Sequence, residues 1–245
     1  METSIRKVRR LFAALIVLFL AAALLPGQTE AASVQSHVKK LEHDAKQLEK
    51  NIQSTNFSKP YRLYNQTKKS YAEAKKVVDR LKNGPMKRQY NARLSKANHT
   101  IQRAAYYISA VESGERLIVL KSQLDKALSS GNVDAVYELY FRMERQLKKS
   151  IALFNRVEYS YVRQKMIEKF QRPAEATKKR AFFPINIMVA FDKIMLAYEK
   201  GDIDEAERLL VLCDQWILQI KDAKTKKELN SYLEEFKGPV VLEIE

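Results

Sequence analysis

The side chains of this sequence that are best suited to bind a ligand are lysines, arginines and tyrosines. They lie close together between positions 57 and 93. This segment reads FSKPYRLYNQTKKSYAEAKKVVDRLKNGPMKRQYNAR, and its only acidic residues are Glu73 and Asp79. Aromatic rings stack on sugar faces or on bases, while Lys and Arg bind carboxylate or phosphate groups. The segment therefore indicates a surface that binds a polyanion.

Two interpretations of the tyrosines are open from spacing alone. Tyr64 and Tyr71 fall on an apolar heptad seam, where a core role and a binding role are equally supported. Tyr61 and Tyr107 fall off the seam, so we expect these two rings to be exposed.

The remaining reactive residue types do not form a catalytic or metal-binding pattern. His37, His43 and His99 match no metal-ligand spacing, and Cys213 has no second cysteine to support a zinc site. The sequence contains neither a glycine-rich phosphate loop nor a GxSxG nucleophile elbow. We therefore predict a protein without catalytic activity, metal or cofactor, in which Cys213 is a buried, unreactive thiol.

A second basic and aromatic stretch, FNRVEYSYVRQKMIEKFQR, spans residues 154–172. Phe154, Val157 and Tyr161 continue an apolar heptad pattern, which indicates packing residues of a long helix from Val133 to about Gln171. Arg156 and Arg163 are seven residues apart and extend the basic surface along one face of that helix.

The first 31 residues have the order of a secretory signal peptide. Four basic residues between positions 6 and 10 precede a 15-residue apolar run, and small residues follow in the segment TEAAS. The run is shorter than the ~18 to 20 residues that span a bilayer, so we predict cleavage after Ala31 and no stable membrane insertion afterwards. The whole chain has 44 Lys and Arg and 29 Asp and Glu; residues 32–245 keep 40 and 27 of these, a net charge of +13. The expected product is a basic, secreted protein of the cell wall or cell surface.

The elements that position these residues are helices. Gly and Pro are confined to breaks between segments rich in Lys, Glu, Leu, Ala and Gln, which favours an all-α protein. Apolar residues alternate at spacings of four and three along three successive segments, separated by loops at residues 56–60 and 83–85. We therefore predict a signal peptide over 1–31, a triple-helical bundle over 32–113, and further helical bundles over 114–245 with a long connecting helix and a short C-terminal tail, GPVVLEIE.

One internal similarity relates ALSSGNVDAVYELY to AYEKGDIDEAERLL, with Gly131 and Gly201 in matching positions. We interpret each as a helix that ends on a left-handed glycine, followed by Asp134 or Asp204 in the first turn of the next helix. A tetratricopeptide-like interaction scaffold is the alternative, although such arrays repeat at about half this spacing and at least three times.

The chain resembles the N-terminal, wall-anchoring region of SbsC-type S-layer proteins. The likeness is carried in order by TEAAS, YRLYNQTKKSY with GPMKRQY, AYYISA, NRVEYSYVRQKMIEKF and GDIDEAERLL. The resemblance implies an elongated all-α rod of consecutive triple-helical bundles joined by long contiguous helices. It also implies non-covalent binding of an anionic secondary cell wall polymer through basic and aromatic residues. Full S-layer proteins continue into lattice-forming β domains, so we expect wall binding without lattice formation by these 245 residues.

Our first hypothesis is thus a non-catalytic, exported protein that binds an anionic cell wall polysaccharide. The second is the extracellular protein-interaction scaffold. Nucleic acid is disfavoured as a partner by the predicted export. In the first bundle we assign glycan binding to Tyr61, Arg62, Tyr64, Asn65, Lys68, Lys69, Tyr71, Lys87, Arg88, Tyr90 and Tyr107; in the later bundles Arg156, Val157, Arg163 and Phe170 match the family pattern, and of these only the arginines are expected to contact ligand.

Overall fold

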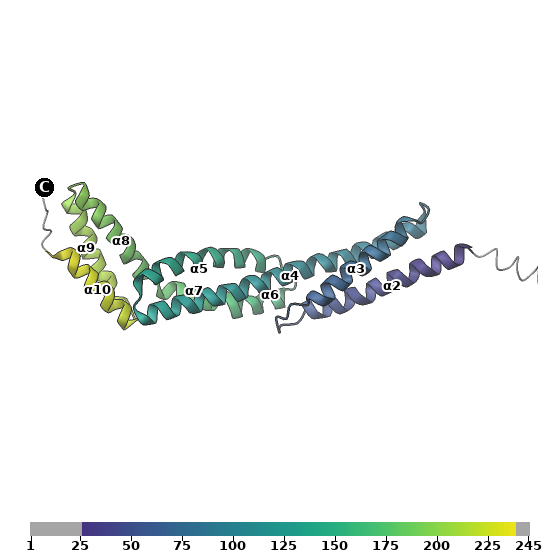
Figure 1. Cartoon of the computed structure of the whole chain (residues 1–245), viewed down its shortest axis with the longest axis horizontal. Helices are drawn as coiled ribbons and strands as arrows, with labels where there is room; N and C mark the ends of the chain where they lie inside the picture. The colour runs from purple at the N-terminus through teal and green to yellow at the C-terminus, as the bar shows by residue number, and fades with distance from the viewer. Residues whose placement is uncertain (1–25, 239–245) are drawn as a thin grey trace, which may run out of the picture. The chain divides into compact units, whose positions relative to one another are not determined.

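The computed structural model describes residues 26–238, and all regular structure in this range is helical (Figure 1). The predicted all-α class is confirmed. Most of the predicted signal peptide, and the tail that follows Gly238, lie outside the described residues. The elements are α2 (Pro26–Ile52), α3 (Tyr61–Asp79), α4 (Pro85–Ser130), α5 (Val133–Phe154), α6 (Ser160–Met166), the π-helix η1 (Ile167–Gln171), α7 (Arg172–Arg180), α8 (Phe182–Glu199), α9 (Ile203–Leu218) and α10 (Ala223–Lys237).

The described chain forms two compact units. The first unit contains residues 26–52 and 60–105, and the second contains residues 53–59 and 106–238. Helix α4 contributes its first part to the first unit and the remainder to the second. The α2–α3 connection belongs to the second unit.

The first unit is a bundle of α2, α3 and the first part of α4. Its core consists of apolar residues from all three helices, and the predicted heptad positions of α2 are buried as expected because they form one stripe along the helix. The loops predicted near residues 56–60 and 83–85 are also present. The core residues are Val34, Val38, Leu41, Ala45, Ala74, Val78, Leu94 and Ala97.

The third helix of the predicted bundle was expected to end near Gly114. In the structure it continues to Ser130. Gly114 is buried inside α4, and a Cβ atom there would lie 2.6 Å from Cδ2 of Phe170. The close approach of the Phe170 ring favours glycine at this position, because any added side chain would force the ring or the helix to shift.

The prediction of a single long helix from Val133 to Gln171 is wrong. Helix α5 ends at Phe154, a turn follows, and α6 begins at Ser160. Val157 is buried within this turn, and Nη1 of Arg163 donates a hydrogen bond to the Val157 carbonyl oxygen at 2.8 Å. The heptad spacing continues through the break because buried residues lie on both sides of the turn, and no Gly or Pro marks it.

The helix following that turn is interrupted by the π-helix η1, immediately before Pro173 in the first turn of α7. Proline has no N–H group, and its ring clashes with the carbonyl four residues earlier in a regular α-helix. The wider π turn accommodates it, and Phe170 at the end of η1 is buried against Phe57 and Phe154 at ring distances of 5.4 and 6.1 Å.

The two predicted glycine hairpins are confirmed. Gly131 and Gly201 adopt φ angles of 79° and 72°, the left-handed conformation that ends a helix. The side chains of Asn132 and Asp202 then accept hydrogen bonds from the backbone N–H groups three residues later, which caps the following helices α5 and α9. Asp134 and Asp204 lie in the first turns, as expected.

Besides the buried rings of Phe57, Phe154 and Phe170, the described part of the second unit contains two larger apolar clusters. One lies among α4, α5, α7 and the start of α8, and the other lies among α8, α9 and α10 with Val133 of α5. Cys213 is buried in the latter core, and burial raises the pKa of its thiol to about 11, so the prediction of a buried thiol is confirmed.

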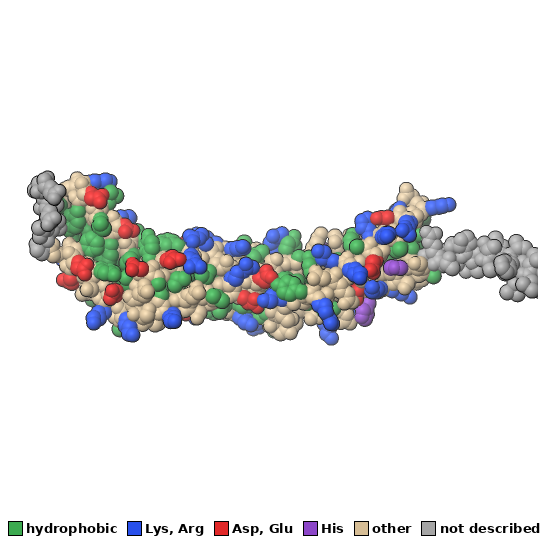
Figure 2. Space-filling view, in the orientation of Figure 1, with side chains coloured by type: hydrophobic (Ala, Val, Ile, Leu, Met, Phe, Trp, Pro, Cys, Tyr) green, Lys and Arg blue, Asp and Glu red, His purple; other side chains and the backbone are tan. Residues whose placement is uncertain are grey.

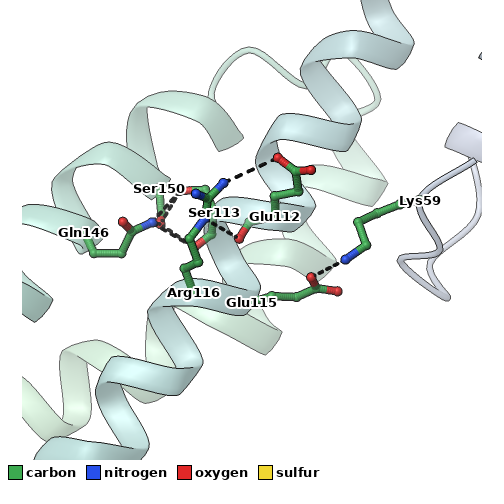
Figure 3. A network of polar contacts seen from close by, with 7 residues as sticks. All are labelled: Lys59, Glu112, Ser113, Glu115, Arg116, Gln146 and Ser150. Carbon is green, nitrogen blue, oxygen red and sulfur yellow. Dashed lines mark hydrogen bonds and ion pairs between the residues drawn. The ribbon is translucent and has the colours of Figure 1, made fainter. Parts of the chain in front are cut away.

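A buried polar cluster joins α4 to α5 within the second unit (Figure 3). The hydroxyl oxygens of Ser113 and Ser150 lie 2.9 Å apart, and Nε2 of Gln146 donates to the Ser113 carbonyl oxygen at 3.0 Å and to its hydroxyl oxygen at 2.8 Å. Because unpaired buried polar groups are costly, this cluster favours one alignment of α4 against α5.

None of the helices in the described range is by itself long and apolar enough to cross a membrane; the bent pair Ser160–Arg180 and Phe182–Glu199 meets that criterion by length and composition.

Candidate functional site: the basic face of the first unit

Charge is distributed very unevenly between the two units. Residues 32–52 and 60–105 carry 16 Lys and Arg and five Asp and Glu, a net charge of +11 out of the +13 carried by residues 32–245. Figure 2 shows Lys and Arg side chains spread over the surface around the histidines, all three of which belong to this unit. The first unit therefore carries nearly all the electrostatic attraction for a polyanion.

All five carboxylates of residues 32–52 and 60–105 are engaged by neighbouring groups. Four form ion pairs: Glu42 with Arg93, Glu49 with Arg103, Glu73 with Lys40 and Asp79 with Lys75. The bidentate contact with Arg93, at 2.6 Å for each bond, lowers the pKa of Glu42. Within residues 32–52 and 60–105, no carboxylate is therefore left to neutralise the other twelve Lys and Arg residues.

The fifth carboxylate, Asp44, is buried and makes no ion pair in the described part of the chain. Its two oxygens accept hydrogen bonds from Nε2 of Gln66 at 2.8 Å and from the hydroxyl of Ser70 at 2.6 Å. Sequence reasoning missed this contact between α2 and α3. Ser70 and Thr67 are polar residues on the otherwise apolar stripe of α3. Their position on the buried side was the one sequence feature that could have indicated a buried polar contact.

The outer side of α3 carries the exposed residues of the site. Thr67, Ser70, Ala74 and Val78 bury the inner side, and helix periodicity places Tyr61, Asn65, Lys69 and Lys76 opposite them. We call the exposed residues Tyr61, Arg62, Asn65, Lys68, Lys69 and Lys76 the basic face of α3.

The basic face of α3 combines one aromatic ring with cations that lack acidic partners. Tyr61 is 44% exposed, so the prediction of an accessible ring is confirmed here. Among the described residues, Arg62, Lys69 and Lys76 have no carboxylate partner, and Lys68 lies over the Tyr64 ring at 5.3 Å from its centroid. An anion at this face would meet several positive charges without displacing an existing ion pair.

The other predicted tyrosines are less accessible. Tyr64 is half-buried, and Tyr71 and Tyr90 are half-buried against the apolar core of the first unit. Cζ of Arg93 lies 5.4 Å from the centroid of the Tyr90 ring. Each of these three rings thus has a packing role and presents only part of its surface to solvent.

Two predicted basic residues lie at the start of α4. Nζ of Lys87 donates hydrogen bonds to the carbonyl oxygens of Asp79 and Leu81, at 2.9 and 3.0 Å, and so caps the C-terminal end of α3. Arg88 is exposed. Lys87 therefore has a structural role at the α3–α4 turn.

The expectation that Tyr107 is exposed is wrong. Only 1% of this residue is accessible, and burial raises the pKa of its hydroxyl to about 12. The hydroxyl donates a long hydrogen bond, 3.5 Å, to the Ser54 carbonyl oxygen. Tyr107 is off the heptad seam of the first unit but lies in the second unit, where the α2–α3 loop covers it.

Two of the three arginines in the stretch 154–172 are also engaged. Arg156 is stacked on Tyr106, with Cζ 4.0 Å from the ring centroid, and Arg163 caps the turn at Val157. As predicted, Phe154 and Val157 are buried, but Tyr161 is 64% exposed because the chain turns before it. In the described range, no group of three or more His, Cys, Asp or Glu side chains is placed to hold a metal ion.

The fold defines an all-helical protein with a basic surface on its first unit, and comparisons with known proteins identify the family. The family model described as "SbsC C-terminal domain" matches residues 44–175, more than half of the chain. The chain belongs to this family of S-layer-related proteins, as the resemblance indicated.

One curated relative, an S-layer protein of Geobacillus stearothermophilus, is 22% identical over 178 residues. The matched region covers 69% of this chain but only 14% of that protein, so the chain spans a small part of its relative's length.

Solved structures show the same fold. The crystal structure of the S-layer protein rSbsC matches with a TM-score of 0.71 at 23% identity, and covers 85% of this chain and 31% of that one. The N-terminal part of the S-layer protein SbsC matches with a TM-score of 0.66 at 22% identity, over 80% and 53% of the two chains. These relationships support a cell-surface protein of the S-layer type.

Proposed function

We propose that this protein binds an anionic cell wall polymer non-covalently, without catalysis, through the basic face of α3 and the neighbouring cations of the first unit. The observation that carries the proposal is the charge balance of this unit: the five carboxylates of residues 32–52 and 60–105 are engaged, while Arg62, Lys69 and Lys76 have no acidic partner among the described residues. A polymer with a repeated negative charge gains from several such contacts at once, whereas a single exposed contact contributes only ~0.2 to 1 kcal/mol.

The aromatic component favours a glycan. The exposed ring of Tyr61 begins α3, and Asn65 and Lys69 follow at intervals of four residues along the same side. An aromatic ring covers the apolar face of a sugar, an amide bonds its hydroxyls, and a lysine binds its acidic group. In line with the predicted signal peptide, the proposed location is the cell wall.

The test is sedimentation of residues 32–245 with purified wall sacculi, before and after removal of the secondary polymer. The triple variant Tyr61→Ala, Lys68→Gln, Lys69→Gln is expected to bind about ten-fold more weakly, from three contacts of ~0.5 kcal/mol or more each. The matched control changes the same residue types in the second unit: Tyr161→Ala, Lys126→Gln, Lys227→Gln. All three control positions are exposed.

Binding by the native protein is expected to fall as salt is raised, since exposed charges are screened over ~8 Å at physiological ionic strength. Equal retention on stripped sacculi would overturn the proposal, as would equal losses for the triple variant and its control.

A further inference from the structure

The second unit contains a cavity of about 790 Å³ that is separate from the basic face of α3. It lies where the end of α7 meets the start of α8 and the α9–α10 connection, and we call it the α7–α8 pocket. Its size is in the range of small-ligand sites. The lining residues that matter for recognition are Tyr140, Lys179, Phe182, Phe183, Gln219 and Lys221.

Ion pairs hold the α7–α8 pocket in shape. Arg180, at the end of α7, binds Asp125 of α4 at 2.9 Å and Asp222, next to α10, at 2.5 Å. Asp125 also accepts a hydrogen bond from the Thr177 hydroxyl at 2.9 Å. These contacts connect three segments of the second unit around the cavity, so little ordering is required when a ligand enters.

The pocket presents an aromatic wall. Phe182 is 51% exposed, and its ring lies 5.3 Å from that of Phe183 at an interplanar angle of 80°. An exposed phenylalanine gains by covering its face with apolar C–H groups. A sugar ring offers such a flat C–H face.

Polar groups of the pocket are available for hydroxyls. Tyr140 is buried, and no hydrogen bond to its hydroxyl is formed by the described residues. The Gln219 amide and the carboxylate of Asp222 also line the cavity. A ligand with several hydroxyls would supply partners for the Tyr140 hydroxyl and the Gln219 amide, whereas the Asp222 carboxylate is already bound by Arg180.

The free positive charges of the pocket are Lys179 and Lys221. Both are exposed, and neither has a carboxylate partner in the part of the chain that the structure describes. In contrast, Lys178 is paired with Glu144 at 2.8 Å, and Arg180 with its two aspartates. The carboxylate of Glu175 also lines the pocket and accepts a hydrogen bond from Gln171 at 2.7 Å. An anionic group on the ligand would therefore meet two lysines that have no ion pair to break.

We propose that the α7–α8 pocket binds a sugar residue that carries a carboxylate, stacked on Phe182 with its acidic group at Lys179 and Lys221. This inference rests on the proposed function in that a wall glycan would supply such a residue. The site is nevertheless in the other unit and shares no residue with the basic face of α3. It would give the protein a second, pocket-type contact with one acidic sugar, besides an extended contact with the polymer.

The test is isothermal titration calorimetry with trigalacturonate and, as a matched neutral ligand, its methyl ester, at physiological ionic strength. The protein is residues 32–245 with the triple substitution in the basic face of α3, so that this face does not contribute. We expect one site that binds the acid at least about ten-fold more tightly than the ester.

Phe182→Ala is expected to weaken both ligands about five-fold, because the stacking surface is lost. Lys179→Gln with Lys221→Gln is expected to abolish the preference for the acid. The controls Leu218→Ala and Lys193→Gln alter an exposed apolar residue and an exposed lysine outside the pocket, and should leave binding unchanged.

Absence of binding at millimolar ligand, equal binding of acid and ester, or equal effects of pocket and control variants would each overturn the proposal. If these experiments fail while sacculi are still retained through the basic face of α3, only the pocket assignment is wrong. If the pocket binds trigalacturonate but native protein binds stripped sacculi equally well, the proposed wall-polymer function is wrong and the pocket stands.

Discussion

Substitution of Gly114 by alanine gives a sensitive test of how α4 packs in the second unit. The new methyl group would lie 2.6 Å and 2.7 Å from Cδ2 and Cγ of the buried Phe170 ring, closer than real Cβ contacts. The ring has little room to move, because Phe57 and Phe154 pack against it. Overpacking of this kind costs ~1 to 3 kcal/mol, whereas alanine in a helix gains ~1 kcal/mol over glycine. We expect Gly114→Ala to lower the free energy of unfolding by about 1 kcal/mol.

The assay is urea unfolding followed by far-UV circular dichroism and by the fluorescence of Trp216, the one tryptophan of the sequence. When Phe170 is replaced by alanine, the clash disappears and Gly114→Ala should become stabilising by ~0.5 to 1 kcal/mol. Gly84→Ala is the control, since no atom lies within 4 Å of its added methyl group. A stabilising Gly114→Ala in the native sequence, or the same effect in both backgrounds, would refute the packing argument.

Three further predictions concern single side chains. Tyr107→Phe should reduce the loss of stability at alkaline pH. The pKa of the Tyr107 hydroxyl is about 12 in the folded protein and ~10 in the unfolded chain, so its contribution to stability is complete below pH ~10 and disappears towards pH 12. Thermal unfolding of the variant and of the unmodified protein across this pH range would detect the difference. Asp44→Ala should cost ~1 to 3 kcal/mol in urea unfolding because the buried Ser70 hydroxyl and the Gln66 amide lose their acceptor, and a neutral result would contradict the importance of that contact. Gly131→Ala should lower the melting temperature more than Gly201→Ala. Both glycines have positive φ, but only at Gly131 would the methyl group approach another segment, at 3.0 Å from the backbone of Lys224. A larger loss for Gly201→Ala would contradict this packing argument.

Much of the fold was predictable because an amphipathic helix requires a regular spacing of apolar residues along the sequence. The spacing of four and three residues identified the buried stripe of α2, and Gly131 and Gly201 marked the ends of helices. The same logic failed at residues 155–159, because a turn with a buried Val157 preserves the spacing and contains no glycine or proline.

The candidate site was predictable in composition but only partly in geometry. Tyr61, Arg62 and Lys69 are exposed as a polyanion site requires, since they lie opposite the buried stripe of α3. Lys87 and Tyr107 did not follow the pattern, because one caps a helix end and the other is covered by a loop distant in sequence.

The all-helical class, the excess of positive charge and the family to which the chain belongs could all be inferred from the amino-acid sequence. These properties depend on periodicity, composition and the order of short motifs, all of which are local. The packing of distant segments is what places Gly114 against Phe170, engages the five carboxylates of residues 32–52 and 60–105, and brings Phe182, Lys179 and Lys221 to one pocket. Those facts depend on which distant segments pack together, and the heptad spacing specifies that a residue is buried without specifying its partner.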